Sequence, residues 1–410
     1  MCASWNNEYR HDLLASAFEK IKLHDKTTGR VSMRGFESQE YFSVLCSMVK
    51  LSEDITEIER HGIITNGVFK AAKKGIITSK SLLNEISALE RSYLQKIESP
   101  FVLATTVSIL NNAKVPTFKI GPATITFSRQ LPPRFTKARE KAESGATHQY
   151  IKANPSNFLT VRVHVKSRTA HDAVNEALNE FDLLRGIWNL GLNKGGIRIS
   201  YGKKMAVNKI VLGPLHTLHD PVGKLKTDIF RYEPQFDELF TPYDWAKTNN
   251  EMNNFVKKVR RKLKRCQYNG VVADSIIRYV RALDYSDLNV AFLKLWGVLE
   301  LLTNTLRDGY DKTIRRAAFL CSERDYHFQV LNHLRDNRNK SVHTGNESPD
   351  TETLVYQLKR YVERLIDFHL SMGQNFTTIG ESTEFLDLPA DKVLLGKRLA
   401  LYKQAVKFIS

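Results

Sequence analysis

Leu331-Asn-His-Leu-Arg-Asp-Asn-Arg338-Asn339-Lys-Ser-Val-His343-Thr-Gly345 is the segment from which the architecture of the C-terminal third follows. Residues of one helix face recur along it and just upstream, at spacings of three and four: His327, Leu331, Leu334, Arg338 and Val342. Gly345 then provides a natural helix stop. The segment predicts a helix with one buried face, with Arg338 at the rim of that face, that ends shortly after His343.

A second apolar helix is predicted at Leu288 to Leu306, around Phe292-Leu-Lys-Leu-Trp296-Gly-Val-Leu-Glu300. Glu300 is the single carboxylate in this helix, and a buried charge is costly unless it is paired. We expect its partner to be an arginine of the facing helix, either Arg338 or Arg335.

The chain contains a second arginine and histidine at the same spacing, in Arg364-Leu-Ile-Asp-Phe-His369. This pair lies in mid-helix among large apolar residues. Residues five apart on a regular helix point about 140° apart, so such a pair meets one ligand only if the helix ends or a partner contributes. We interpret His369, and likewise His327, as core or surface histidines with satisfied hydrogen bonds.

The densest basic run is Phe255-Val-Lys-Lys-Val-Arg-Arg-Lys-Leu-Lys-Arg265. Its apolar positions form one helical face: Phe255, Val256, Val259 and Leu263. Its candidate phosphate-binding cations are Lys257, Lys258, Arg261, Lys262 and Arg265. A solvated helix face and a phosphate-binding face both fit this pattern. Weaker candidates lie in residues 132–156, where Pro-Pro, Ser-Gly and Asn-Pro steps predict a long loop: Arg134, Lys137, Arg139 and Lys141.

The middle of the chain is rich in Val, Ile, Thr and Phe. Strands are predicted at 158–165, where apolar and polar residues alternate, and at 123–127, 196–201 and 209–212, with a packed helix at 170–190. Residues 13–95 have helical spacing instead. Two similar segments there, Gly62-Ile-Ile-Thr65 and Gly75-Ile-Ile-Thr78, suggest helix starts capped by threonine.

These patterns predict a multidomain α+β protein. Residues 1–98 form a helical region, 99–244 an α+β domain, 245–374 an all-α bundle, and 375–410 a tail with a helix. Within this plan, residues 215–241 are a linker rich in Pro and Asp, 376–389 are irregular, and 390–409 are helical.

Composition points to a polyanionic partner. Among 410 residues, 61 Lys and Arg face 44 Asp and Glu, a formal net charge of +17. The longest apolar run, 101–110, is too short to span a bilayer, and no signal peptide is expected, so nucleic acid is favoured over membrane. The cysteines Cys2, Cys46, Cys266 and Cys321 lack metal or disulfide spacing, which favours a reducing cytoplasm.

The Trp296 and Glu300 helix, the segment 314–320 and Arg338-Asn339-x-x-x-His343 together resemble the HEPN superfamily, especially its ApeA-like anti-phage group. The likeness covers roughly residues 270–374. It implies a bundle of four or more helices and a metal-independent endoribonuclease without a cofactor. It also implies a homodimer through the HEPN domain in which two motifs share one cleft. The N-terminal 240 residues are similar in position to the sensor domains of such defence proteins.

The residues suit that chemistry on their own terms. The 2′-hydroxyl of RNA can attack the adjacent phosphate if a group near neutral pKa moves protons, which suits His343. Arg338 can hold two phosphate oxygens, and Asn339 can orient either residue. Glu300 is expected to support Arg338, and no cluster of metal-binding carboxylates lies nearby.

We therefore expect an RNA-cutting effector of abortive infection, with RNA, tRNA included, as the partner and a phage-derived trigger. The alternative is a non-catalytic HEPN-fold protein that binds nucleic acid or acts as a scaffold.

Overall fold

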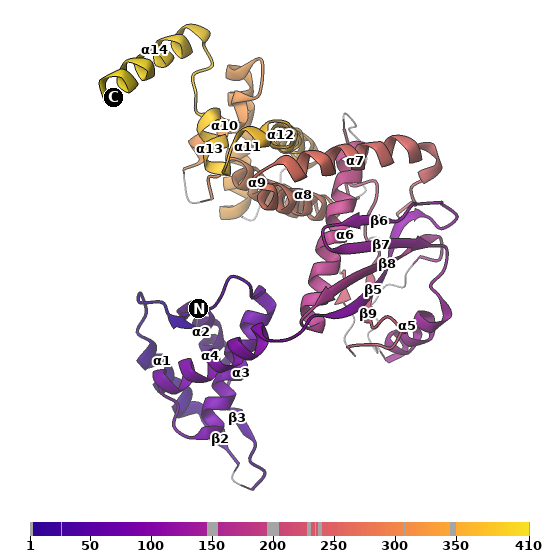
Figure 1. The fold of residues 1–410 in the computed structure, drawn as a ribbon, viewed down its shortest axis with the longest axis vertical. Helices are drawn as coiled ribbons and strands as arrows, with labels where there is room; N and C mark the ends of the chain where they lie inside the picture. The colour runs from indigo at the N-terminus through magenta and orange to yellow at the C-terminus, as the bar shows by residue number, and fades with distance from the viewer. Residues whose placement is uncertain are drawn as a thin grey trace. The chain divides into compact units, whose positions relative to one another are not determined.

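The computed structural model describes the chain apart from residues 1–2, 26, 146–154, 195–204, 228–230, 234, 237–239, 307–308, 345–349 and 410. For residues 143–145 and 343–344 it describes the backbone alone. The fold is mixed α+β, as predicted (Figure 1). Two compact units are present. The first comprises Met1–Phe101 and His164–Glu176, and the second Val102–Val163 and Ala177–Ser410.

The first unit is mainly helical, which confirms the prediction for the N-terminal region. Its helices are α1 (His11–Ile21), α2 (Glu37–Met48), α3 (Glu57–Lys74) and α4 (Ser79–Leu94). Two short antiparallel pairs accompany them: β1 (Ser4–Trp5) with β4 (Val49–Lys50), and β2 (Lys22–His24) with β3 (Val31–Met33). Phe18, Ile64, Leu82 and Ile86 are fully buried in the shared core of these elements.

Only one of the two predicted threonine caps is present. Thr78 caps α4, in a capping box with Ser81. The segment Gly62 to Thr65 lies inside α3, whose cap is Thr56. The acidic residues Glu57 and Glu59 of the first turn favour the earlier start, because they complement the positive end of the helix.

The first turn of α6 (Ala170–Leu192) completes the first unit through Asp172, whose side chain is buried. Its carboxylate accepts hydrogen bonds from the hydroxyls of Thr56 at 2.6 Å, Tyr93 at 2.7 Å and Thr169 at 2.8 Å. The carboxylate and burial raise the pKa of the Tyr93 phenol above its ordinary value, with burial the larger cause. Asp172 therefore ties the starts of α3 and α6 to the end of α4.

A six-stranded sheet forms the centre of the α+β part of the second unit, in the order β10-β9-β5-β8-β7-β6. The strands are β5 (Ser99–Leu110), β6 (Phe118–Ile120), β7 (Ala123–Ser128), β8 (Phe158–Ser167), β9 (Leu215–His219) and β10 (Arg231–Tyr232). β7, β8 and α6 confirm the elements predicted at 123–127, 158–165 and 170–190. β5 and β9 pair antiparallel, with Ala104 opposite Thr217.

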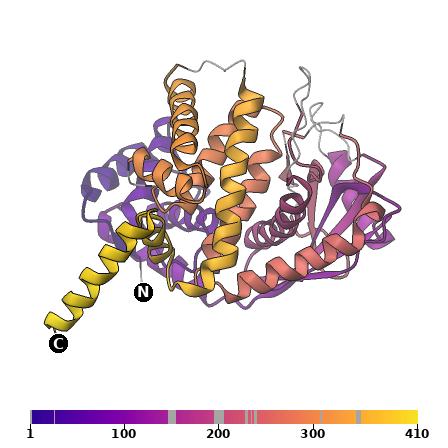
Figure 2. The same ribbon diagram turned by 90° about the horizontal axis from the view of Figure 1, so that it is seen from above.

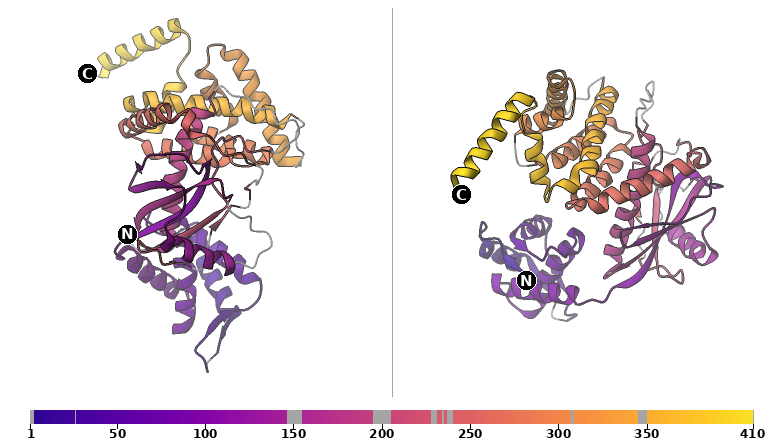
Figure 3. Two further views of the ribbon diagram at one scale, coloured as in Figure 1. Left: turned by 90° about the vertical axis from the view of Figure 1, so that its right-hand side faces the viewer. Right: turned by 45° about the horizontal axis from the view of Figure 1, so that its top comes forward.

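Helices cover both faces of this sheet (Figure 3). On one face, Trp188 of α6 is fully buried against Phe118 and Phe127, at ring-centroid distances of 5.9 and 5.8 Å. On the other, Phe135 of α5 (Pro133–Gly145) meets the ring of His219 edge to face. Both faces of the sheet therefore carry packed aromatic side chains.

Three predictions for this part are wrong. Residues 133–145 form α5 rather than a loop, because Pro133 suits a first helical position and Phe135 buries against the sheet. The expected linker 215–241 contains β9, all of whose residues are buried. The predicted strand at 209–212 forms only an isolated bridge from Leu212 to Val107. The expected strand at 196–201 and the part of the expected loop at 146–154 lie outside the described residues.

The rest of the second unit is helical, as predicted. Its elements are η1 (Trp245–Lys247), α7 (Asn249–Arg265), α8 (Asn269–Leu283), α9 (Leu288–Leu302), α10 (Tyr310–Phe319), α11 (Arg324–Thr344), α12 (Thr351–Met372), η2 (Gly373–Asn375), α13 (Ile379–Leu386) and α14 (Lys392–Ile409). α9 packs against both α8 and α12, and α11 lies beside α12 (Figure 2).

The tail departs partly from expectation. α13 lies within 376–389, which were expected to be irregular, because Thr378 caps it and Leu386 is buried. α14 confirms the predicted terminal helix, and none of its residues is buried. In the part of the chain that is described, no helix combines the length and apolar character needed to cross a bilayer.

Candidate nucleic-acid interface and active site

The Arg338-Asn339-x-x-x-His343 segment forms the last turns of α11. The helix runs without interruption to Thr344, so it ends just before Gly345, as predicted, and not between Arg338 and His343. A regular helix carries positions five apart in directions about 140° apart. The side chain of His343 lies outside the described residues.

The guanidinium of Arg338 is held by an aromatic ring. It lies over Tyr310, the first residue of α10, at 5.1 Å from the ring centroid, and Nη1 donates to Asn339 Oδ1 at 3.4 Å. Among the described residues, no carboxylate pairs with Arg338, which is half-buried. The Arg338 guanidinium is thus held in place by Tyr310, has no carboxylate partner among the described residues, and can bind an anionic ligand.

The predicted ion pair between Glu300 and Arg338 or Arg335 is wrong. Glu300 accepts a hydrogen bond from the indole Nε1 of Trp296 at 2.8 Å, one turn earlier on the same helix. Arg335 instead pairs with Asp311 at 3.1 Å and with Asp336. Trp296 lies four positions before Glu300 on the same helix face and is therefore closer to it than an arginine of the facing helix, so Glu300 bonds to Trp296.

A chain of contacts through two aromatic rings connects Glu300 to Arg338. The Trp296 ring meets Tyr310 edge to face at 6.2 Å, and Tyr310 in turn carries the Arg338 guanidinium. Tyr310 is the site residue that sequence reasoning missed. The Trp296 and Glu300 spacing could have revealed the hydrogen bond, but no local pattern signals the contact from α10 to α11.

The buried face of α11 is shorter than predicted. Leu331 and Leu334 are fully buried, whereas Val342 is 50% exposed. The buried stripe therefore ends near Arg338, and Val342 lies outside the core. Ser341 is the exception, since its hydroxyl donates to Asn289 Oδ1 of α9 at 2.7 Å.

The other histidines of the bundle have structural partners, as predicted. His369 is fully buried, its Nε2 donates to the carbonyl of Leu302 at 2.9 Å, and its Nδ1 lies 3.0 Å from the hydroxyl of Tyr268. Burial lowers the pKa of His369 to about 4. His327 lies 2.8 Å from the Tyr361 hydroxyl, and burial likewise lowers its pKa.

α7 separates apolar and cationic residues onto opposite faces. Met252, Val256, Val259 and Leu263 are buried, and Phe255 is half-buried near Gly191 of α6. The exposed face carries the predicted cations Lys257, Lys258, Arg261 and Arg265, together with Arg260 and Lys264. None of these six forms an ion pair with a residue that the structure describes. Lys262 is half-buried and donates to Ser371 Oγ at 2.8 Å.

The weaker basic candidates on α5 have mixed outcomes. Arg134 and Lys137 are exposed, and the Arg134 guanidinium lies over the Phe135 ring. The prediction of Arg139 as a phosphate ligand is wrong, because this side chain is buried and donates to the carbonyls of Ala104 and Leu215, each at 2.9 Å. It joins α5 to β5 and β9 instead.

The Arg338-Asn339-x-x-x-His343 segment at the end of α11 and the cationic face of α7 are thus the features suited to an anionic ligand. Comparisons with protein-family models, with curated proteins and with solved structures find no match. What these residues do must therefore be inferred from their own geometry.

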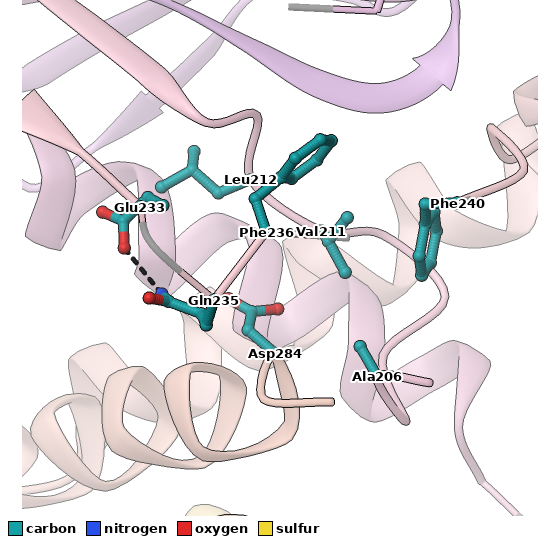
Figure 4. A pocket seen from close by; sticks show the side chains of 8 residues that line it. All are labelled: Ala206, Val211, Leu212, Glu233, Gln235, Phe236, Phe240 and Asp284. Atoms are coloured by element: carbon teal, nitrogen blue, oxygen red, sulfur yellow. Dashed lines mark hydrogen bonds between the residues drawn. The ribbon is translucent and has the colours of Figure 1, made fainter. Parts of the chain in front are cut away.

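A cavity beside the sheet is too small for a substrate (Figure 4). It measures about 20 Å³, which is room for about one water molecule. Figure 4 shows Glu233 and Asp284 on its wall, with Gln235 donating to Glu233 at 2.6 Å. In the described ranges, no three His, Cys, Asp or Glu side chains are grouped to hold a metal ion.

Arg185 of α6 centres a buried polar network next to this cavity. Its Nη2 donates to Asp182 at 2.5 Å and to Asp284 at 2.9 Å. Although burial opposes ionisation of Asp182, Arg185 and Arg281 hold its pKa below the ordinary value. Asn208 donates to the other oxygen of Asp284 at 2.7 Å. An arginine with no exposed surface is thus neutralised from two sides.

The network continues into the bundle. Asn193 donates to Asn208 at 3.2 Å, and Lys359 of α12 donates to the carbonyl of Asn193 at 2.9 Å. Lys359 also pairs with Glu363, which accepts from the Tyr279 hydroxyl of α8. These bonds join α6, which covers the sheet, to two bundle helices, so the α+β part and the bundle form one unit.

Proposed function

We propose that this chain is a metal-independent endoribonuclease of HEPN type that cuts RNA by attack of the substrate's own 2′-hydroxyl. The observation that carries the proposal is the state of Arg338. It is fixed over Tyr310 without a carboxylate partner among the described residues, and it shares the end of α11 with His343.

The proposed step needs only proton movement and charge stabilisation. The 2′-oxygen forms a bond to phosphorus, the bond from phosphorus to the 5′-oxygen breaks, and the products are a 2′,3′-cyclic phosphate and a 5′-hydroxyl. A base takes the 2′-hydroxyl proton and an acid protonates the leaving oxygen, roles that suit His343. Arg338 balances the charge that develops on the phosphate oxygens. Asn339 orients Arg338, to which it is hydrogen-bonded.

Glu300 has a supporting role in this proposal, though not the one expected from the sequence. It positions Trp296 by accepting the indole hydrogen bond, and Trp296 packs on Tyr310. The Tyr310 ring in turn fixes the position of the Arg338 guanidinium, which lies over it. Glu300 is thus a positioning residue that acts through two rings.

We propose that the active site is shared by two copies of the chain. α11 continues past His343, so one helix directs positions 338 and 343 about 140° apart. A C2 dimer in which the ends of two α11 helices meet brings an arginine and a histidine from different copies to one phosphate. Light scattering measures the assembly directly. Mixed dimers of Arg338→Ala and His343→Ala should regain one functional site if the motifs act across the interface.

The cationic face of α7 is the proposed RNA-binding surface. Its six exposed Lys and Arg side chains lack ion-pair partners among the described residues, which leaves them free to replace counterions on a phosphate backbone. This surface also favours the second candidate function, a non-catalytic RNA-binding or scaffolding protein, because it requires no chemistry.

Cleavage assays separate these two functions. Purified protein should cut total RNA, and Arg338→Ala or His343→Ala should abolish cutting while binding persists. His333→Ala is the matched control, because this exposed histidine lies on the same helix and, among the residues that the structure describes, its ring bonds only to Asn337. Cleavage should persist in a chelator, and a deoxy substitution at the cut site should block it. Cutting of a fully deoxy strand, or restoration of lost cleavage by magnesium, contradicts the mechanism.

We further propose a role in abortive infection, with tRNA among the substrates and a phage-derived trigger sensed by the N-terminal half. Overexpressed wild-type protein should arrest growth and degrade RNA, and His343→Ala should not. Equal toxicity of the two proteins favours the non-catalytic function.

A further inference from the structure

A second cavity lies where α10, the start of α11 and the segment from α13 to α14 come together. Its volume of about 330 Å³ falls within the range of small-molecule sites, roughly 300–1,000 Å³. Arg324, which lines it from the start of α11, is 14 residues before Arg338, or about 21 Å along the helix. A ligand here is therefore distinct from the phosphate proposed at Arg338.

The walls of this cavity are mostly aromatic and aliphatic. Phe319, Phe328, Leu386, Leu388 and Pro389 contribute to them. Phe319 is engaged on one face, where the Arg324 guanidinium lies 4.8 Å from the ring centroid. Phe328 is 37% exposed, so part of its ring is open to a flat ligand. Such a ring is a stacking platform that accepts any base.

Three arginines, Arg315, Arg324 and Arg398, line the same cavity. Arg324 donates from Nε to the carbonyl of Phe319 at 3.2 Å, and its terminal nitrogens have no partner among the described residues. Arg398 of α14 is exposed and pairs with no described carboxylate. Two guanidinium groups are thus free to hold a phosphate.

Two carboxylates also line the cavity, and they do not cancel this charge. Asp387 accepts both Nε and Nη2 of the buried Arg316, and Arg315 lies 3.3 Å away. Burial favours its neutral form, but the Arg316 bonds hold the pKa of Asp387 below the ordinary value. Asp325 is exposed in the first turn of α11 and is an acceptor for the amino group of a base.

We propose that this cavity binds a nucleotide unit, with the base against Phe328 and the phosphate held by Arg324 and Arg398. The apolar walls can pack against the base, and the guanidinium groups of Arg324 and Arg398 can bind the phosphate. The same chemistry is offered by a free nucleotide and by one residue of an RNA strand. The proposal does not depend on cleavage by Arg338 and His343.

Calorimetric titration of the full-length chain tests the proposal, with 5′-AMP, adenosine and inorganic phosphate as separate ligands. AMP should bind, and adenosine or phosphate alone should bind at least about tenfold more weakly. Phe328→Ala and Arg398→Glu should each weaken AMP binding about tenfold, in keeping with the strength of base stacking and of phosphate contacts. Lys403→Glu, the same charge change on α14 but outside the cavity lining, should leave binding within about twofold.

A hexadeoxyadenylate strand distinguishes the two sources of the nucleotide. If it binds more tightly than AMP and Arg398→Glu weakens it, the cavity is a subsite for a strand, and if AMP binds more tightly, it is a free-nucleotide site. Both results support the proposal. Absence of AMP binding at millimolar concentration, or unchanged binding in both cavity variants, overturns it. Because the readout is binding, either outcome leaves the cleavage proposal to its own test.

Discussion

His369→Gln should make the stability of the second unit less sensitive to acid. In the folded chain, burial lowers the pKa of His369 to about 4, whereas an unfolded histidine has a pKa near 6.5. The unfolded state therefore binds the proton first as the pH falls. The stabilisation by neutral His369 is complete above about pH 6.5 and is lost progressively toward pH 4.

The size of the effect follows from that pKa difference. The full difference corresponds to about 3 kcal/mol, of which about 2 kcal/mol is lost near pH 5. Glutamine keeps both hydrogen-bonding functions, since its amide can donate to the Leu302 carbonyl and accept from the Tyr268 hydroxyl. It has no charge to gain. Between pH 7.5 and 5, wild-type protein should lose about 2 kcal/mol more stability than His369→Gln.

Urea denaturation at the two pH values, followed by tryptophan fluorescence, measures this difference. Three of the four tryptophans, Trp188, Trp245 and Trp296, lie in the second unit, so the signal reports mainly on it. His333→Gln is the control and should follow the wild type, because that side chain is exposed. Parallel loss of stability in wild type and His369→Gln would refute a neutral, buried His369. If the proposed nuclease is active, His369→Gln should also retain cleavage.

Three further outcomes are expected. Asp172→Ala removes the acceptor of the Thr56, Tyr93 and Thr169 hydroxyls and should destabilise the first unit by about 3 kcal/mol in chemical denaturation, and a loss under about 1 kcal/mol would contradict its role. Arg185→Met leaves buried Asp284 without its cation and Asp182 with Arg281 alone, and should cost about 3–5 kcal/mol. Arg278→Ala, which breaks an exposed pair with Asp274, should cost under about 1 kcal/mol. Replacing Lys257, Arg261 and Lys264 together by glutamine should reduce the slope of log affinity for single-stranded RNA against log salt by about 2, and an unchanged slope would exclude α7 from the interface.

Periodicity predicted the elements whose two faces differ. α7 has a buried face and a charged face, and the run from Leu331 to Leu334 marks the buried side of α11, so both helices are readable from spacing. β8 is readable because Arg162 and His164 alternate with buried valines. In such elements, the spacing of apolar residues in the sequence shows which face is buried.

Elements were missed where that contrast is absent. Every residue of β9 is buried, including His216 and Thr217, whose side chains find partners in Thr105 and His219. Polar residues that are satisfied inside a core look like loop residues in a sequence. α5 is hard to predict for the opposite reason, because its many charged residues mask the buried Phe135 and one of them, Arg139, is itself buried.

For the candidate site, spacing identified Arg338, Asn339 and the end of α11, but it could not identify what holds the arginine. Tyr310 lies 28 residues earlier in the chain and reaches Arg338 through tertiary packing. The Glu300 partner was misjudged for a related reason. The sequence suggests a buried carboxylate that needs a cation, whereas Glu300 is only partly buried and accepts an indole N–H from the preceding turn.

The N-terminal unit is discontinuous along the chain, since it takes in His164–Glu176 as well as Met1–Phe101. Exchange of this unit between proteins by recombination therefore needs three crossover points rather than one. A single crossover near residue 101 would replace α1 to α4 but keep Thr169 and Asp172 of the original chain. Asp172 would then lose its hydrogen-bond partners Thr56 and Tyr93. A change in this unit that preserves the Asp172 contacts is thus expected to arise by substitution on the existing helices, and not by transfer of the N-terminal segment alone.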